Sequence, residues 1–147
     1  METGNLMIDA QTAFSREQRR RRRERAAGWL TRRSREDNGL ISLDQALHAA
    51  PPAARRPAGL SAIPLASIVG TAEEAKARTF DRRFRPQSSS RGRWERLWMA
   101  GRRGASLPPI SVYRLGDEHF VRDGHHRVSV ALSLGMAAID AEVTELR

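Results

Sequence analysis

Nine consecutive residues decide the fold of this chain of 147 residues: Val121-Arg122-Asp123-Gly124-His125-His126-Arg127-Val128-Ser129. A β-rich run ends at Asp123, Gly124 permits a tight turn, and apolar residues with helical spacing follow at once. The stretch therefore predicts a strand and a helix joined by one glycine. Five polar side chains surround that turn, so we expect the functional site here.

The flanking sequence completes a small sheet. Residues 110–114 alternate as a strand, Gly116-Asp117 forms a turn, and residues 119–122 return as the second strand of a hairpin. Residues 139–143 alternate again as a closing strand, and residues 63–69 form a β-rich run upstream. The order of these elements predicts an α+β fold, a small mixed sheet with helices.

The N-terminal segment is expected to be largely helical and basic. Residues 1–14 carry no clear pattern, so we expect them to be disordered. Ser15-Arg16-Glu17-Gln18 matches a capping box and predicts an arginine-rich helix over residues 16–35. Its apolar content is thin and includes Trp29 and Leu30. A helix with so few apolar residues is stable only if its small apolar patch packs against the rest of the protein or if it binds a partner.

A proline-rich stretch separates this segment from the sheet. A second capping box at Ser42 predicts a short helix, which Pro51-Pro52 ends. Residues 51–59 contain three prolines and indicate a linker. We therefore expect two parts, a basic helical arm with its linker in residues 1–58 and the α+β domain in residues 59–147.

The middle of the chain contains two further expected helices and a basic loop. A third capping box at Thr71 predicts a short helix over residues 72–79, and residues 80–92 have the composition of a basic loop. Residues 93–101 place Trp94, Leu97 and Trp98 at helical spacing on one face. That spacing favours core packing of the tryptophans over stacking on bases.

Composition excludes several classes of function. The chain contains no cysteine, which excludes disulfide scaffolds, thiol nucleophiles and cysteine-ligated zinc. Its longest stretch without charge, residues 57–72 around the run 59–71, is broken by Pro64 and is shorter than the ~20 apolar residues that a membrane span needs. No secretory signal fits the N-terminus. We expect a cytoplasmic protein without a membrane partner, with the nucleoid as a candidate location.

Positive charge is concentrated in two segments. The net charge is +9, and Lys76 is the only lysine. Residues 1–59 have a net charge of +5 and residues 76–104 of +8, whereas residues 105–147 have −2. This asymmetry favours a polyanionic partner, because each neutralised phosphate releases counterions. The alternative is that arginines only cover a solvated surface.

The turn at residues 123–127 has the chemistry of an anion site. Free N–H groups at a helix start attract a phosphate, and Arg127 is placed to bind it with both arms of its guanidinium group. His125 and His126 donate hydrogen bonds or accept protons near neutral pH. Asp123 is a candidate Mg²⁺ ligand. The candidate nucleotide-binding residues are Gly124, His125, His126, Arg127 and Ser129.

Two simpler interpretations compete with this site. Asp123 alone is more typical of a helix N-cap than of a metal ligand. A transition-metal site with His119, Asp123 and His125 is disfavoured, because His125 and His126 point about 100° apart on a helix and no cysteine is present.

Residues 60–147 resemble the ParB N-terminal (ParB/sulfiredoxin-like, "ParB-like nuclease") domain family. That family has an I-P-L-x-x-I strand, a P-I-x-V strand, a G-x-x-R turn at a helix start, an L-G helix end and a final strand. The matching residues here are Ile63-Pro64-Leu65-Ala66-Ser67-Ile68, Pro109-Ile110-Ser111-Val112, Gly124-His125-His126-Arg127, Leu134-Gly135 and residues 139–143.

The resemblance implies different activities in different branches. In partition proteins the turn usually reads G-E-R-R and binds the triphosphate of CTP with Mg²⁺, and a helix-turn-helix domain follows; here the chain ends at Arg147. The sulfiredoxin branch uses a cysteine, so that activity is excluded. The free-serine kinase branch has a turn like Asp-Gly-His-His-Arg and a glutamate base, a role open to Glu73 or Glu74. No residue demonstrates a nuclease centre.

Our first hypothesis is a ParB-like protein that binds a nucleoside triphosphate with Mg²⁺ and associates with DNA, with a homodimer as one expected assembly. The arginines expected to contact nucleic acid are Arg19, Arg20, Arg21, Arg22, Arg23, Arg82, Arg83 and Arg85. The alternatives are a small-molecule kinase, a nuclease, or a non-enzymatic module that binds RNA or protein. The kinase would use Glu73 or Glu74 as base and His125 or His126 to stabilise transferred charge.

Overall fold

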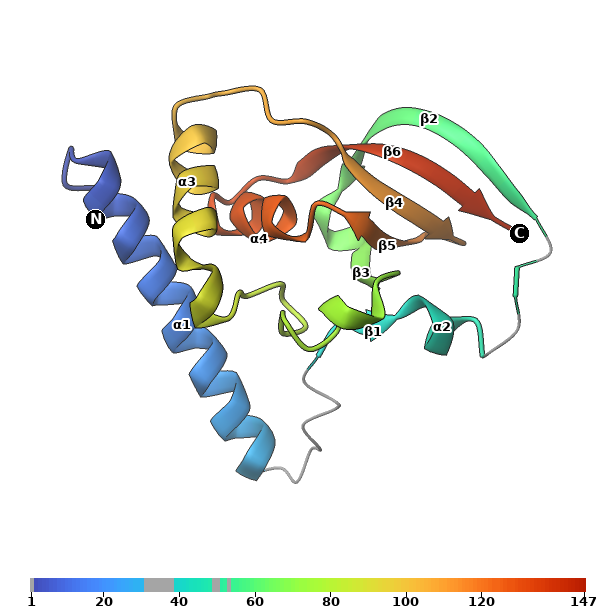
Figure 1. The fold of residues 1–147 in the computed structure, drawn as a ribbon, viewed down its shortest axis with the longest axis horizontal. Helices are drawn as coiled ribbons and strands as arrows, with labels where there is room; N and C mark the ends of the chain where they lie inside the picture. Colours follow the sequence, from blue (N-terminus) through green and yellow to red (C-terminus); the bar gives the residue numbers. More distant parts are fainter. Residues whose placement is uncertain (1, 31–38, 49–50, 53) are drawn as a thin grey trace.

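A computed structural model describes residues 2–30, 39–48, 51–52 and 54–147. Its sheet has six strands in the order β1-β3-β5-β4-β6-β2 (Figure 1). The strands are β1 (Ile41–Ser42), β2 (Arg55–Pro64), β3 (Ile68–Thr71), β4 (Ile110–Leu115), β5 (Glu118–Asp123) and β6 (Ala138–Leu146). The α-helices are α1 (Leu6–Leu30), α2 (Leu43–Ala46), α3 (Arg91–Arg102) and α4 (His125–Ser133). Short 3₁₀ turns are η2 (Leu65–Ser67), η3 (Glu74–Lys76) and η4 (Ser88–Ser90).

The sheet is mixed, which confirms the predicted α+β class. Strands β4 and β5 form the expected antiparallel hairpin, and β4 also pairs with β6 in parallel. Strand β3 runs parallel to β5, and β2 runs antiparallel to β6 at the edge of the sheet. Helix α4 follows β5 directly, as the sequence predicts, so the Asp-Gly-His-His-Arg turn lies at the end of a central strand.

The main core lies between the sheet and α4. Val112 and Val121 on the sheet pack with Val128 on α4. Phe80 and Phe84 close this core from the loop that precedes α3, and both side chains are almost fully buried. This loop is therefore fixed by apolar burial although its sequence is strongly basic.

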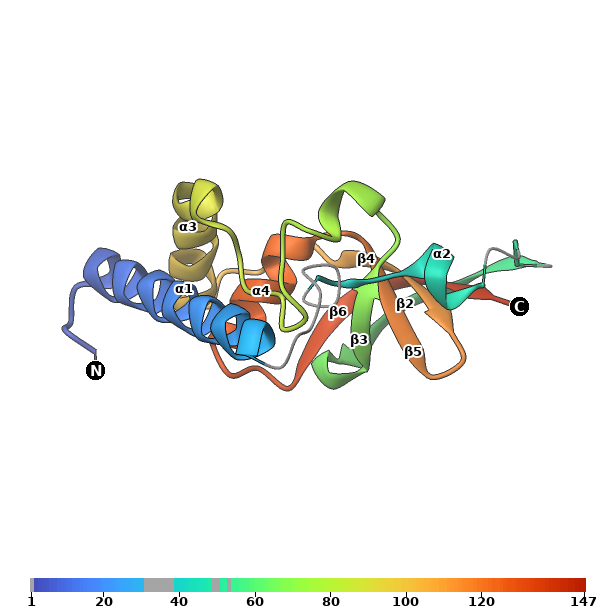
Figure 2. The same cartoon turned by 90° about the horizontal axis from the view of Figure 1, so that it is seen from below.

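A second core joins the three longer helices, which lie toward one end of the sheet with α4 nearest to the strands (Figures 1 and 2). Trp94 and Trp98 of α3 pack with Phe14 of α1 and Val130 of α4. The rings of Phe14 and Trp94 meet edge to face with their centroids 5.5 Å apart. The tryptophans are core residues, which confirms the interpretation of their helical spacing.

The expected disorder of residues 1–14 is wrong for the described residues. Helix α1 begins at Leu6, because the Asn5 side chain accepts hydrogen bonds from the N–H groups of Met7 and Ile8. Ala10 and Phe14 are fully buried against α3. The capping box at Ser15 lies inside the helix, and the predicted end at residue 35 falls outside the described residues.

The predicted linker is also wrong where residues 55–59 are concerned. They belong to β2, which pairs with the alternating residues of β6 from Arg55 opposite Leu146 to Pro64 opposite Ala138. Strand β2 runs through the expected boundary between residues 58 and 59. Helix α1 and strand β2 thus contribute to the same cores and sheet as the rest of the chain, and the division into two domains stays a prediction.

Three local predictions need correction. The predicted helix over residues 72–79 is reduced to the turn η3. Thr71 lies in β3, and its hydroxyl accepts the N–H of Glu73. The run 63–69 is divided by η2 into the end of β2 and the start of β3. Helix α2 forms as expected, but the hydroxyl of Ser42 donates to Glu74 and accepts no hydrogen bond from the first turn of the helix.

Among the described residues, no helix is both long enough and apolar enough to cross a membrane.

Candidate anion-binding pocket

The turn between β5 and α4 depends on Gly124. Its φ of 107° lies in the left-handed region, where residues with a side chain are strained. A Cβ atom at this position would lie 2.5 Å from Cγ2 of Ile110. No side chain caps the first turn of α4, so the N-cap interpretation of Asp123 is wrong. The N–H groups of that turn are left for a ligand.

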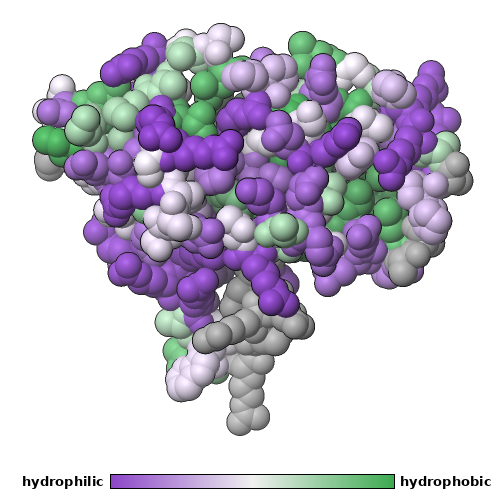
Figure 3. Space-filling model, in the orientation of Figure 1, coloured by the Kyte–Doolittle hydropathy of each residue, from purple (hydrophilic) through white to green (hydrophobic). Residues whose placement is uncertain are grey.

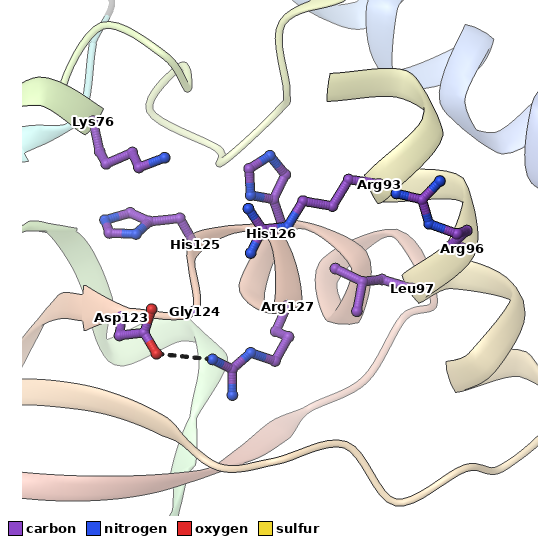
Figure 4. Close-up of a pocket in the computed structure, with 9 residues that line it drawn as sticks. All are labelled: Lys76, Arg93, Arg96, Leu97, Asp123, Gly124, His125, His126 and Arg127. Carbon is purple, nitrogen blue, oxygen red and sulfur yellow. Dashed lines mark hydrogen bonds and ion pairs between the residues drawn. The ribbon is translucent and has the colours of Figure 1, made fainter. Parts of the chain in front are cut away.

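A pocket of about 320 Å³ opens at this turn. Its lining residues are Lys76, Arg93, Arg96, Leu97, Asp123, Gly124, His125, His126 and Arg127 (Figure 4). They come from η3, α3 and the β5–α4 turn, which are far apart in the sequence. Four of these side chains are cationic and only Asp123 is acidic, so the pocket is electropositive.

Three of the cations were missed as site residues by sequence reasoning. Arg93 and Arg96 lie three residues apart on α3, beside the buried tryptophans, and Lys76 lies in η3. Lys76 and Arg93 reach toward the histidine pair from opposite sides (Figure 4). The net charge of residues 76–104 was the available signal, but only tertiary packing brings these cations to the turn, that of α3 on α4 in the case of Arg93 and Arg96.

His125 is buried and held in one orientation. Its Nε2 lies 2.7 Å from the hydroxyl of Thr71, and its ring stacks on that of Phe80 with the centroids 5.9 Å apart. Burial, then the charges of Lys76 and His126, lower the pKa of His125 to about 4, against the smaller opposing effect of Asp123. The ring is therefore neutral near pH 7, and it can donate or accept a hydrogen bond without carrying charge.

His126 carries a buried polar atom without a hydrogen-bond partner. The residue is 8% exposed, and the atom is Nε2 of its ring. Burial, then the charges of Arg93 and Lys76, lower its pKa to about 4. A buried polar atom normally has a partner, so this nitrogen of a pocket-lining residue is an unfilled hydrogen-bonding position.

Arg127 and Asp123 form the lower wall of the pocket. Arg127 donates through Nη1 to the carbonyls of Pro108 and Pro109 at 2.7 and 2.8 Å, and through Nη2 to Asp123 at 3.1 Å. These contacts use three of the five N–H donors of the guanidinium group. Arg127 thus ties α4 to the segment before β4, in addition to lining the pocket.

The other predicted site residues lie outside the pocket. Ser129 is buried and accepts a hydrogen bond of 2.8 Å from Nε1 of Trp94, so it has a structural contact in place of the expected ligand contact. Glu73 is exposed, and Glu74 accepts a hydrogen bond from Ser42. His119 faces Ser67 at 2.8 Å. Within the described ranges, no group of three or more histidines and carboxylates could hold a metal ion.

The arginines expected to contact nucleic acid fall into two groups. Arg21 is buried, and its guanidinium group donates to the carbonyls of Thr79, Arg78 and Arg85. The Arg85 side chain is 13% exposed and pairs with Asp81, Glu17 and Glu24. These two arginines hold α1 to the loop before α3. The exposed arginines are Arg19, Arg20, Arg22, Arg23, Arg82 and Arg83.

No protein-family model matches the chain, and none of the curated proteins compared with it is similar. Among solved structures, sulfiredoxin from Arabidopsis thaliana is similar at 18% identity, with a TM-score of 0.43, over 57% of this chain and 82% of that chain. The α+β class rests on the sheet and helices described above. Membership of the ParB/sulfiredoxin-like family stays a prediction.

Proposed function

We propose that this chain binds the phosphate groups of a nucleoside triphosphate, CTP or ATP, in the pocket at the start of α4, and that its exposed arginines associate with DNA. The observation that carries the proposal is a pocket at an uncapped helix start that is lined by Lys76, Arg93 and Arg96. Cations and free N–H groups directed at one space are the chemistry that recognises phosphate.

The balance of charge supports a phosphate ligand over a neutral one. Asp123 is the one acidic side chain of the pocket lining, and it is already paired with Arg127. Lys76, Arg93 and Arg96 therefore keep an excess of positive charge, which polyphosphate neutralises. The neutral histidines add hydrogen bonds, and Nε2 of His126 gains the partner that it lacks.

Mg²⁺ fits this site as a companion of the triphosphate. Mg²⁺ commonly binds through one or two carboxylates together with substrate phosphates and water. The Asp123 carboxylate is 77% exposed and uses Oδ2 for Arg127. Asp123 would be the protein ligand, and the ion would neutralise part of the triphosphate charge.

The kinase alternative is less well supported. Transfer of phosphate to a hydroxyl group needs a base near the phosphate, and neither Glu73 nor Glu74 lines the pocket. The exposed arginines instead support a polyanionic partner, whose affinity falls with salt as counterions are released.

Calorimetric titration of CTP, ATP, ADP and GTP with Mg²⁺ tests this proposal. We expect one nucleotide to bind, Arg93→Ala and Arg96→Ala each to weaken it about tenfold or more, and Arg103→Ala to leave it unchanged. Arg103 is the matched control, because it is exposed at the end of α3 and does not line the pocket. CTP selectivity would favour a partition-type nucleotide switch, and ATP or ADP selectivity a kinase. Failure of all four nucleotides to bind would overturn the proposal.

A further inference from the structure

The end of α1 exposes a large aromatic side chain. Trp29 is 81% exposed and the adjacent Leu30 is 76% exposed, the highest values among the large hydrophobic side chains of the described ranges. Trp94 and Trp98, in contrast, are 0% and 7% exposed. The apolar patch that the sequence assigns to this helix is therefore not used in packing, since α1 packs on α3 through Ala10, Ala13 and Phe14.

Trp29 shares one side of α1 with three exposed arginines. At 100° per residue, Arg19, Arg22, Arg25 and Trp29 fall within about 120° of the helix circumference. They extend over about 15 Å along the axis at 1.5 Å per residue. We call these four residues the α1 stripe. Figure 3 shows hydrophilic surface along the lower part of α1 and a small hydrophobic patch at its end.

The stripe carries positive charge that no acidic residue of the described part neutralises. Glu17 and Glu24 of α1 lie toward the body of the protein, where both pair with Arg85. Arg19, Arg22 and Arg25 take part in none of the ion pairs of the described residues. An exposed row of cations that ends in an aromatic ring is complementary to a ligand with phosphates and an accessible flat base.

We infer that the α1 stripe binds single-stranded nucleic acid, with the arginines on its phosphates and Trp29 stacked on a base. This inference rests on the proposed association with nucleic acid and narrows it to single strands. A base in a duplex has both faces covered by its neighbours, whereas a single strand offers a face to an aromatic side chain. DNA and RNA strands share this chemistry.

Tryptophan fluorescence tests the inference on the full chain, because Trp29 is the exposed one of three tryptophans. We expect oligothymidylate or oligouridylate to quench this fluorescence, and a duplex of the same length to quench it weakly. Trp29→Ala should weaken single-strand binding by about 5- to 150-fold, the range for one stacked base, and leave duplex binding unchanged. Leu30→Ala is the matched control and should bind like the wild type. The thymidylate and uridylate arms separate DNA from RNA.

Two sets of variants distinguish failure of the stacking inference from failure of the proposed association with DNA. If Trp29→Ala binds single strands as tightly as the wild type while Arg19→Ala with Arg22→Ala weakens all nucleic acids, the stacking inference is overturned and the association with DNA remains. A duplex that binds more tightly than the single strand, without quenching Trp29, overturns it as well. If the double arginine variant changes no binding, the nucleic-acid role of α1 fails altogether.

Discussion

The ring of His126 meets the ring of Phe80 edge to face, with the centroids 5.0 Å apart, and its Nε2 is buried without a hydrogen-bond partner. Leaving a buried polar atom without a partner costs about 1–3 kcal/mol. His126 therefore weakens the folded state of the free protein. A ligand that gives Nε2 a hydrogen-bond partner removes that cost, so His126 should contribute to the affinity for such a ligand.

His126→Phe should leave the free energy of unfolding unchanged or raise it by up to about 1–3 kcal/mol, because the unpartnered nitrogen is removed. The same variant should bind triphosphate more weakly than the wild type. Urea denaturation and calorimetry measure the two effects. His119→Phe is the comparison, because His119 has a partner in Ser67 and its replacement should destabilise the fold. Equal destabilisation by both variants would contradict this account.

Acidification should destabilise the protein between about pH 6.5 and pH 4. The pKa of His125 and of His126 is lowered from 6.5 to about 4 in the folded state, so the unfolded chain binds more protons in this window. The contribution of these two histidines to the free energy of unfolding is thus fully present above pH 6.5. It falls toward pH 4, by at most about 1.4 kcal/mol per pH unit for each histidine. Urea denaturation of wild type and His126→Phe measures the difference, which isolates one histidine from the carboxylates. Parallel pH profiles of the two proteins would argue against the lowered pKa.

Gly124→Ala should destabilise the fold more than Gly116→Ala. Both glycines have a positive φ, 107° and 62°, so both variants lose about 1–2 kcal/mol through backbone strain. At Gly116 nothing lies within 4 Å of the added Cβ atom, whereas at Gly124 it meets Ile110 at 2.5 Å. Overpacking should therefore lower the free energy of unfolding of Gly124→Ala by about 1–3 kcal/mol more than that of Gly116→Ala. Denaturant unfolding of the two variants measures this difference. Equal losses would show that Ile110 moves aside freely.

Two neighbouring arginines of α1 should have different roles. Arg21→Ala should mainly lower stability, and Arg22→Ala should mainly weaken nucleic-acid binding. The Arg21 guanidinium group donates to three backbone carbonyls, so its removal should cost about 1.5–3 kcal/mol of stability. Arg22 is exposed, and its removal should change stability by less than about 0.5 kcal/mol but reduce the salt dependence of nucleic-acid binding by about one phosphate contact. Thermal unfolding and binding at several salt concentrations measure both. The reverse pattern would contradict the assigned roles.

The C-terminal third of the fold follows from local sequence. Alternation defines β4, β5 and β6, and the glycines at 116, 124 and 135 mark the turns between regular elements. The candidate site was located for the same reason, since its central turn is one continuous stretch. The local sequence pattern is sufficient to predict elements whose structure is determined by residues that are neighbours in the sequence.

The remaining features depend on contacts between distant residues. The buried side of α1 includes Glu17 and Arg21, so its apolar periodicity is hidden, and its packing becomes clear only with Trp94 in place. Strand β2 has an unremarkable, proline-containing sequence, and pairing with β6 makes it a strand. Lys76 and Arg93 reach the pocket through tertiary packing, which no local pattern reports.

Histidine ring resonances provide the most direct measurement of the pocket. The chain has four histidines, of which His125 and His126 line the pocket. In ¹H–¹⁵N spectra, CTP or ATP with Mg²⁺ should shift the ring nitrogens of these two residues and raise their pKa from about 4, while the rings of His48 and His119 keep their chemical shifts. Unchanged ring resonances of His125 and His126 at saturating nucleotide would contradict the claim that this pocket holds phosphate.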